Sequence, residues 1–453
     1  MEYTQAKRKP VTPRIIIHGG AGNITQENLP PKALAAYRSA LLGILGRANE
    51  KLSEPHASAL DVATYAVSLL ELDGMFNSGR GAVFTTAGTH ELEASVMVSR
   101  GYNKRGCGVM CVKKAKSPIM LAKEMLIRGQ TADGGGAQGH CQLQGEICDK
   151  LNDQWGLESV KPSYFWVRKR WDEHRKGLGL VRDDETYDKA KKAADSEYNR
   201  DTASQTHIQD VSMELSSVDQ CAVGDIHWNG RDYLPQGTVG AVVLDSRGVL
   251  CVATSTGGLT NKLPGRIGDT PTLGAGFWAE EWQTQTTKSV PVAASPMSQL
   301  VASAGECFPG ISTYLPLPPS DAAFLNVKHS THFRGVAMSG TGNGDSFLRV
   351  AAARTAAAMV RFGSQSTYTS SGNGQQISLQ QAVTAVAGPH GELQLSAGDR
   401  WHKTGEGEGG IIGIELDQYG EGHVVFAWNC GGMFHAWIDD NGEEQFEVFQ
   451  PKP

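Results

Sequence analysis

The sequence predicts an α+β domain built from two halves, and three observations lead to this prediction. Helical apolar spacing is concentrated in the first part of the chain, β-branched hairpins dominate the second part, and a long polar segment lies between them. Each helix or sheet must bury an apolar face against another element, so this order favours layers of helices and sheets. A chain of 453 residues is long enough for one large domain with insertions.

The first half begins with a strand and continues with two helices. Residues 15–17 are three isoleucines that run into the glycine turn 18–22, a pattern typical of a buried strand. Apolar residues recur at helical spacing over 34–45 and 60–72. After a glycine-rich turn at 77–83 we expect strands over Leu92–Val98 and Gly106–Val112, and a helix from Pro118 to about Ile127.

A polar segment separates the two halves. Residues 132–139 are rich in glycine, and residues 165–200 carry many charges with little apolar periodicity. Such a composition is typical of a long mobile linker. We therefore expect a linker over about 131–237 that ends abruptly at Gly237.

Hairpins and an inserted loop are expected in the second half. An apolar strand from Thr238 to Leu244 is followed by a turn at 245–248 and a returning strand at 249–255. Residues 281–332 contain prolines and little periodicity, and we interpret them as an inserted loop. The remaining expected elements are a strand at 335–338, a long helix over 342–362 and a hairpin over 410–428.

Composition and charge argue against several classes of protein. The net charge of -6 leaves no basic field for nucleic acid, and no apolar run approaches the roughly 18 residues of a membrane span. The polar N-terminus lacks the apolar region of a secretory signal. The eight cysteines are scattered, and Cys107 and Cys111 have no second close pair to complete a zinc pattern. We expect free thiols and a cytoplasmic protein.

Thr238 opens the second half directly after the polar segment. A threonine that starts a strand is usually structural, and its hydroxyl is a poor nucleophile unless a base lies beside it. Three glycine-rich motifs follow, however: ATSTGG at 253–258, GRIGDTP at 265–271 and GAG at 274–276. Their Arg266 and Asp269 suit a zwitterionic ligand, with the guanidinium for a carboxylate and the carboxylate for an ammonium, although a loop salt bridge is the alternative.

These motifs, in this order, resemble the start of the β-subunit of plant-type asparaginases and isoaspartyl aminopeptidases. The matching segments of the second half are GTVGAVVLD at 237–245, ATSTGG, GRIGDTP, LGAG at 273–276 and GTGNGD at 340–345. Those of the first half are HGGAG at 18–22, FNSGRGAV at 76–83 and LEASVM at 92–97. The resemblance covers about residues 14–130, 237–280, 335–362 and 408–435.

The resemblance implies a four-layer αββα sandwich of the N-terminal-nucleophile (Ntn) hydrolases, made as one inactive precursor. The matching threonine attacks the carbonyl of the preceding glycine, and an N→O acyl shift followed by hydrolysis splits the chain. The products here would be an α-subunit, 1–237, and a β-subunit, 238–453, which together form one catalytic domain. The α-amino group freed on Thr238, with a reference pKa of about 7.7–8.0, would then be the general base.

Further roles follow from the resemblance, one residue at a time. For catalysis it implies that Thr256 orients the nucleophile, and that the Thr341 hydroxyl and the Gly342 N–H form an oxyanion hole. For substrate binding it implies Arg266 for the α-carboxylate, Asp269 for the α-ammonium, Gly344 through its carbonyl, and Asn77 beside the site. The loop near Leu72 and Phe76 resembles one that binds a structural sodium ion through backbone carbonyls, and we expect no other cofactor.

Departures from the family pattern leave the reaction type intact and the substrate open. Residues 281–332 stand where the family loop is short, Gly340 replaces a frequent threonine or serine, and Asn343 stands where several members have histidine. We expect hydrolysis of free L-asparagine, of isoaspartyl dipeptides, or of both, by a homodimer of αβ units. The alternatives are a glycosylasparaginase, a threonine-aspartase-like endopeptidase, which cleaves itself after aspartate rather than glycine, and an unprocessed scaffold.

Overall fold

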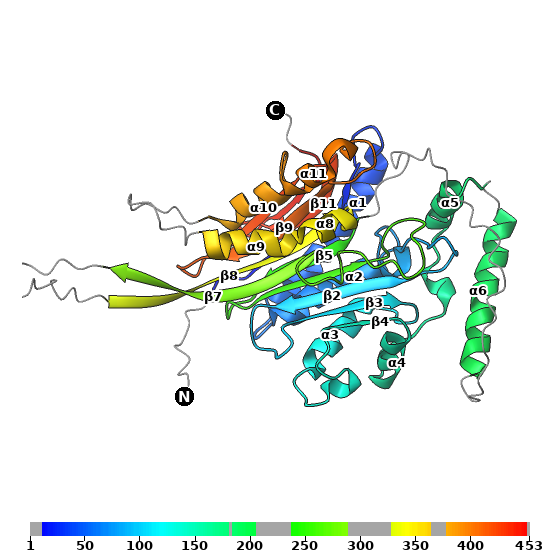
Figure 1. The fold of residues 1–453 in the computed structure, drawn as a ribbon, viewed down its shortest axis with the longest axis horizontal. Coiled ribbons are helices and arrows are strands. Elements are labelled where there is room, and N and C mark those ends of the chain that lie inside the picture. The colour runs from blue at the N-terminus through cyan, green and yellow to red at the C-terminus, as the bar shows by residue number, and fades with distance from the viewer. Residues whose placement is uncertain (1–10, 181–183, 205–236, 289–327, 364–376, 451–453) are drawn as a thin grey trace, which may run out of the picture.

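Two β-sheets and the helices packed on them make up the described part of the protein (Figure 1). The computed structural model describes residues 11–180, 184–204, 237–288, 328–363 and 377–450. Within these residues no helix is long and apolar enough to cross a membrane. The helices and strands of the described residues confirm the expected mixture of helices and sheets.

The larger sheet interleaves strands from both halves of the chain. Its order is β12-β11-β1-β5-β6-β2-β3-β4. The bounds of these strands are β1 Arg14–Gly22, β2 Leu92–Val98, β3 Gly106–Val112, β4 Gln142–Gln144, β5 Val239–Leu244, β6 Leu250–Thr256, β11 Gly432–Ile438 and β12 Glu444–Glu447. Strand β5 pairs with β1 on one side and β6 on the other, and β6 pairs with β2. The residue at the start of β5 thus lies among strands from both halves.

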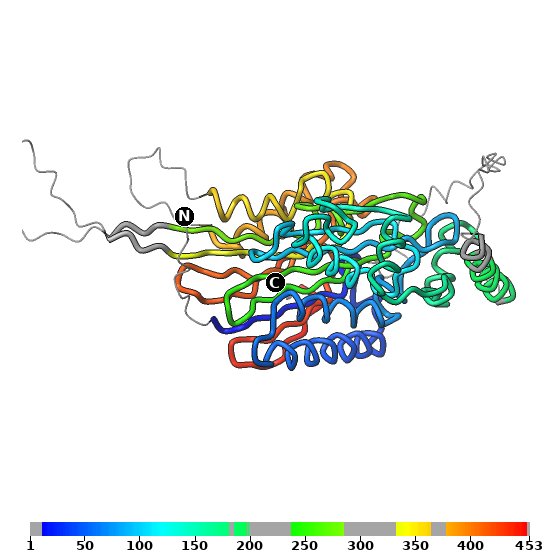
Figure 2. Tube along the Cα trace, turned by 90° about the horizontal axis from the view of Figure 1, so that it is seen from below, coloured from blue at the N-terminus to red at the C-terminus, as the bar shows by residue number. Residues whose placement is uncertain are grey.

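The smaller sheet has the order β10-β9-β8-β7 and is antiparallel throughout. Its strands are β7 Phe277–Lys288, β8 Lys328–Gly342, β9 Gly409–Leu416 and β10 Gly422–Trp428. The ends of β7 and β8 project from one end of the molecule (Figures 1 and 2). The inserted loop expected over 281–332 is wrong at both ends, because the pairing of β7 with β8 continues to Lys288 and Lys328. Threonines in these ends suit a strand, and residues 289–327 lie outside the described part.

Helices of the first half cover one face of the larger sheet. They are α1 Pro31–Leu52, α2 Ala59–Leu72 and α3 Pro118–Arg128. Helix α2 begins where the Ser58 side chain accepts a hydrogen bond from the Asp61 N–H, a typical N-cap. Leu41, Leu45 and Val67 from these helices join Ile15 and Ile17 of β1 in one buried core.

Helices of the second half pack on the smaller sheet: α8 Gly344–Val350, α9 Ala352–Phe362, α10 Leu379–Ala387 and α11 Glu392–Ala397. The single helix expected over 342–362 is wrong, because Ala351 interrupts it in a left-handed conformation with φ of 47°. At the break, the N–H groups of Ala353 and Arg354 donate to the carbonyls of Ala275 and Gly274. Those loop carbonyls satisfy the free donors at the start of α9.

The two sheets bury a third apolar cluster between them. Ile16 and Val242 of the larger sheet meet Ala337 and Ile412 of the smaller sheet. Side chains alternate along a strand, so Ile15 and Ile17 face the helices while Ile16 faces the other sheet. Burial on both faces explains why the sequence has three consecutive isoleucines.

The middle of the chain is folded over residues 131–180 and 184–204, which corrects the mobile linker expected over 131–237. Its elements are the 3-10 turns η2 Gly134–Gly136 and η3 Pro162–Phe165, strand β4, and helices α4 Glu146–Gln154, α5 Arg168–Gly177 and α6 Asp184–Ser204. Trp166, Trp171 and Tyr187 pack around Phe84 in a small core of their own. A few large aromatic side chains thus hold a segment that lacks apolar periodicity. Residues 205–236 of the expected linker lie outside the described part.

Candidate active site

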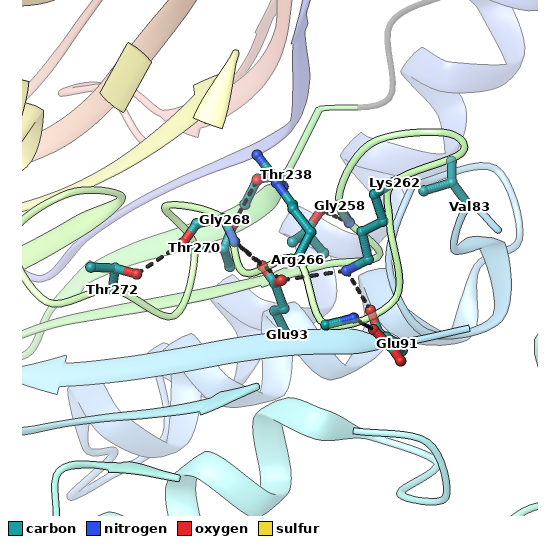
Figure 3. Close-up of polar contacts among 12 residues, drawn as sticks. Val83, Glu91, Glu93, Thr238, Gly258, Lys262, Arg266, Gly268, Thr270 and Thr272 are labelled. Carbon is teal, nitrogen blue, oxygen red and sulfur yellow. Dashed lines mark hydrogen bonds and ion pairs between the residues drawn. The ribbon is translucent and has the colours of Figure 1, made fainter. Parts of the chain in front are cut away.

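Thr238 lies at the start of β5 and is only 5% exposed. Its hydroxyl forms a hydrogen bond with the Thr270 hydroxyl, with 2.7 Å between the oxygens, and Figure 3 shows the two side chains facing each other. Its carbonyl oxygen accepts a hydrogen bond of 3.1 Å from the hydroxyl of Thr341. The predicted nucleophile is therefore buried and held at two atoms.

Gly237 is pressed against the backbone of β1. A Cβ atom at this position would lie 2.6 Å from the Cα of Gly20, 2.5 Å from the backbone N of Ala21 and 2.6 Å from the hydroxyl oxygen of Thr341. Two of these neighbours are backbone atoms that cannot turn away, so only glycine fits here. The contact explains why the glycine-rich end of β1 is needed beside the bond between Gly237 and Thr238.

Thr341 and Gly342 lie at the end of β8. The Thr341 hydroxyl donates to the Thr238 carbonyl and accepts from the Ala21 N–H, each at 3.1 Å. Gly342 has φ of 139°, and a Cβ there would lie 2.4 Å from the carbonyl oxygen of Glu408. The predicted oxyanion donors thus lie next to the nucleophile, at a position where glycine is required.

A buried histidine joins the two sheets beneath the nucleophile. The Nε2 atom of His18 lies 2.7 Å from the hydroxyl of Ser339, and His18 pairs with Gly240 in the ladder of β1 and β5. Burial lowers the pKa of His18 to about 3, so its ring is neutral at physiological pH. We therefore read His18 as a link between the sheets.

Thr256 and Asn77 belong to one hydrogen-bond network. The Thr256 hydroxyl accepts from the Gly258 N–H at 3.0 Å and from the Asn77 amide at 3.5 Å. The same amide donates to the Gly258 carbonyl at 2.7 Å, while its oxygen accepts from the Val83 N–H. Thr256 lines the pocket together with Thr238, whereas Asn77 lies behind that lining.

Thr270 is a site residue that the sequence reasoning missed. Its hydroxyl, rather than that of Thr256, forms the hydrogen bond to the Thr238 hydroxyl in this continuous chain. Its carbonyl accepts hydrogen bonds from Ser95 at 2.6 Å and Thr254 at 3.2 Å, which fix the backbone at this point. The available signal was its place directly after Asp269 in the GRIGDTP motif.

Arg266 and Asp269 bring opposite charges to the pocket. Arg266 donates to Asp345 at 3.1 Å, on the outer side of the pocket. Asp269 is 4% exposed, and no hydrogen-bond donor within the described residues reaches its Oδ2 atom. Burial raises the pKa of Asp269 to about 7, Arg266 opposes the rise, and nearby Glu93 adds to it. A buried carboxylate with a free oxygen is suited to bind a cationic group.

Gly344 leaves the space beside that carboxylate. A Cβ on Gly344 would lie 2.5 Å from the Oδ1 atom of Asp269 and 3.1 Å from the Nη2 atom of Arg266. Gly344 is the first residue of α8 and lines the pocket. The absence of a side chain keeps both charged groups accessible to a ligand.

Glu93 and Lys262 form a buried ion pair that the sequence reasoning also missed. The Nζ atom of Lys262 lies 3.4 Å from Glu93 and donates to the carbonyl of Glu91 at 2.8 Å. Both carboxylate oxygens of Glu93 accept from the Gly268 N–H at 3.2 Å (Figure 3). The pair ties the loop after β6 to strand β2, next to Arg266 and Asp269.

A small cavity brings most of the predicted site residues together. Its lining residues are Glu93, Thr238, Thr256, Gly258, Leu259, Arg266, Asp269, Gly342 and Gly344. A larger depression of about 480 Å³ lies at the turn between α1 and α2, but none of the predicted site residues line it. We assign the site to the smaller cavity, because it contains the nucleophile and both charged groups.

The loop expected to hold sodium already contacts a fixed cation. The guanidinium of Arg170 donates to the carbonyls of Met75 and Gly81, at 3.0 and 2.9 Å. The arginine thus occupies the carbonyls of Met75 and Gly81, while the sodium site expected near Leu72 and Phe76 stays a prediction. No step proposed below depends on a metal ion.

Comparisons with known proteins point to one family. A family model described as asparaginase matches residues 11–286, which is more than half of the chain. A putative isoaspartyl peptidase/L-asparaginase of Dictyostelium discoideum is 28% identical over 431 residues, covering 95% of this chain and 94% of its own. An isoaspartyl peptidase of Escherichia coli (strain K12) is 29% identical over 423 residues, covering 93% and 92%. A plant-type L-asparaginase of Pyrococcus furiosus is 30% identical over 267 residues, covering 59% and 70%. The resemblance in the sequence motifs is confirmed.

Proposed function

We propose, because this chain belongs to the asparaginase family, that it is a threonine-type Ntn hydrolase that cleaves the β-amide of L-asparagine and of isoaspartyl dipeptides. The observation that carries the proposal is the pocket in which Thr238 faces Arg266 and the free carboxylate oxygen of Asp269. A substrate with an α-carboxylate and an α-ammonium matches these two charges. The names of the relatives above describe the same substrates.

Self-cleavage of the precursor is the first step of this proposal. The hydroxyl oxygen of Thr238 attacks the carbonyl carbon of Gly237, and the hydroxyl proton is transferred to the departing α-amino nitrogen of Thr238. The peptide C–N bond breaks, Gly237 is transferred to the hydroxyl oxygen as an ester, and water then releases the carboxylate of Gly237. The tight packing of Gly237 against β1 supports this step, because it fixes the scissile bond next to the hydroxyl.

Hydrolysis of the substrate follows the same chemistry. The freed α-amino group of Thr238 accepts the hydroxyl proton, and the oxygen attacks the β-carbonyl carbon of the substrate. The Thr341 hydroxyl and the Gly342 N–H stabilise the resulting oxyanion, and one such donor is typically worth about 3–4 kcal/mol. The C–N bond breaks, the amine leaves with a proton, and water hydrolyses the ester to release L-aspartate.

We also infer the higher-order arrangement from the fold. Helices on the outer face of each sheet and an apolar cluster between the sheets favour the αββα sandwich of Ntn hydrolases. A homodimer of αβ units is expected, and sedimentation of the purified protein tests it. Six cysteines of the described part are free thiols, which fits a reducing cytoplasm.

Two measurements on the purified chain test the proposed function. Gel electrophoresis with N-terminal sequencing should give two bands, one of which begins at Thr238. Release of L-aspartate should be seen with L-asparagine and a β-aspartyl dipeptide, and less with N-acetylglucosaminyl-asparagine. A single uncut band that is inactive on all three compounds would leave an unprocessed scaffold as the better description.

A further inference from the structure

We propose that helix α5 is a positioning element of the active site, with Arg170 and His174 as the residues through which it acts. This inference rests on the proposed function. The helix lies at the end of the molecule opposite the projecting hairpin of β7 and β8 (Figure 1). None of its residues lines the pocket, so its influence on the reaction passes through the two loops that it contacts.

Arg170 holds both ends of the turn that carries Asn77. Its side chain is 2% exposed, and it donates from Nε to the Gly81 carbonyl at 2.9 Å and from Nη2 to the Met75 carbonyl at 3.0 Å. Its Nη1 atom donates to Glu173 of the same helix at 3.0 Å. A planar guanidinium can bridge two carbonyls in this way, whereas a lysine ammonium cannot do so with fixed geometry.

Asn77 connects the turn held by Arg170 to the lining of the pocket. Its side-chain amide donates to the Gly258 carbonyl at 2.7 Å and contacts the Thr256 hydroxyl. Its backbone carbonyl accepts from the Gly257 N–H at 3.1 Å. Thr256 and Gly258 line the cavity beside Thr238. The position of this turn therefore determines where Thr256 lies in the pocket lining.

His174 holds the second loop. Its Nδ1 atom forms a hydrogen bond with the side-chain oxygen of Asn261, and its carbonyl accepts from the Asn261 amide at 3.1 Å. Asn261 has φ of 58° and precedes Lys262, which forms the buried ion pair with Glu93. The contact thus fixes a residue in the left-handed conformation directly beside the ion pair between Lys262 and Glu93.

Phe84 joins the two contacts into one unit. Its carbonyl accepts from the Asn261 N–H at 2.8 Å, and its ring lies 5.4 Å from that of Trp171 and 5.3 Å from that of His174. Arg170 and His174 are four residues apart and lie on one face of the helix. Helix α5 therefore packs against both loops at once. It precedes Gly237, so it stays in the α-subunit after the proposed cleavage.

Two variants and a matched control test this role. Arg170→Gln removes the bridge to the turn, and His174→Phe keeps a ring against Phe84 while removing the hydrogen bond to Asn261. Lys176→Gln removes a positive charge from an exposed position of the same helix. Each protein is assayed for kcat and KM on a β-aspartyl dipeptide, for its melting temperature, and for hydrogen exchange of peptides covering 75–84 and 257–262.

The two variants should separate the kinetic constants. We expect Arg170→Gln to lower kcat by about 10- to 100-fold, because small displacements of a catalytic wall are costly. We expect His174→Phe to raise KM by about fivefold, because this is the effect of losing roughly one hydrogen bond beside the charged groups. In each variant the loop it contacts should exchange faster, self-cleavage should persist, and Lys176→Gln should match the wild type.

The outcomes distinguish this inference from the proposed function. If both loops exchange at the wild-type rate in both variants, or if they loosen while kcat and KM stay unchanged, the positioning role is wrong. The other contradicting result is a loss of kcat together with melting temperature and with exchange protection across the whole protein. That result would indicate a general structural role and would also overturn the positioning role. A wild-type protein without hydrolase activity would refute the proposed function, and the exchange comparison, which needs no substrate, would still decide whether α5 holds the loops.

Discussion

Two clusters of residues around the nucleophile, here called walls, are held by different forces. One wall, here named the cleavage wall, consists of Gly20, Ala21, Gly237, Thr238 and Thr341. It is uncharged and is held by backbone contact and hydroxyl hydrogen bonds. The other, named the recognition wall, consists of Glu93, Arg266 and Asp269 of the pocket lining together with Lys262, the ion-pair partner of Glu93. It contains two buried carboxylates and two cations.

This difference separates the two proposed reactions. Cleavage of the chain depends on the shape of the uncharged wall, where a single methyl group would collide with backbone atoms. Recognition of a free substrate depends on ionised groups of the charged wall, which the scissile peptide does not need. Substitutions in the cleavage wall should therefore affect both reactions, and those in the recognition wall only turnover.

Thr238→Ala should abolish both reactions, because it removes the only group proposed to attack either carbonyl. The measurement is gel electrophoresis of the aged protein together with an assay for released L-aspartate. Thr238→Ser, which keeps a hydroxyl, is the matched variant and should retain both at a lower rate. Two subunits in the alanine variant would contradict the nucleophile assignment.

Arg266→Ala should raise KM by about 10- to 100-fold while the chain still cuts itself. The loss corresponds to one hydrogen-bonded charge, worth about 1.5–3 kcal/mol. Asp345→Asn is the matched control, since it removes the observed partner of Arg266 without removing the guanidinium. Steady-state kinetics on a β-aspartyl dipeptide measure the effect, and an unchanged KM would exclude Arg266 from the site.

The affinity for the product L-aspartate should fall as the pH drops through about 7. The pKa of Asp269 is raised to about 7, so the carboxyl group is protonated below that pH in the empty pocket. Only the ionised form attracts the ligand ammonium, and below this pKa the ionised fraction falls about tenfold per pH unit. Calorimetric titration from pH 5 to 8 (about two units below and one above this pKa) measures the effect.

The variant Asp269→Asn serves as the control for this pH dependence. It should bind L-aspartate weakly at every pH and should lack the acidic loss of affinity, because an amide does not ionise. If the wild-type affinity stays constant across the same range, Asp269 does not bind the ammonium group in its ionised form.

Thr270→Val should slow turnover by about fivefold, the smallest of these effects. It removes one hydrogen bond to the nucleophile, worth about 1 kcal/mol, and keeps the volume of the side chain. Because Thr270 stands between the two walls, both self-cleavage and hydrolysis should slow together. Thr270→Ser should behave like the wild type, and a faster valine variant would show that this bond restrains the nucleophile instead of orienting it.

Much of the fold followed from local patterns. Strands β2 and β3 have the expected bounds, because each is an apolar run closed by turn residues. The break at Ala351 could not be predicted, since alanine favours a helix and the loop carbonyls at 274–275 that satisfy the new helix start are distant in sequence. Helices α5 and α6 were missed because a few aromatic contacts with Phe84 replace a regular apolar stripe.

The same division applies to the site. The sequence alone predicted Arg266 and Asp269 from their charges and Thr238 from the resemblance of its motifs to those of the family. Only the tertiary structure assigned the nucleophile's hydrogen bond to Thr270 and added Glu93 to the pocket lining, with Lys262 as its ion-pair partner. Hydrogen bonds and ion pairs between separate strands depend on register and side-chain direction, which no local pattern encodes.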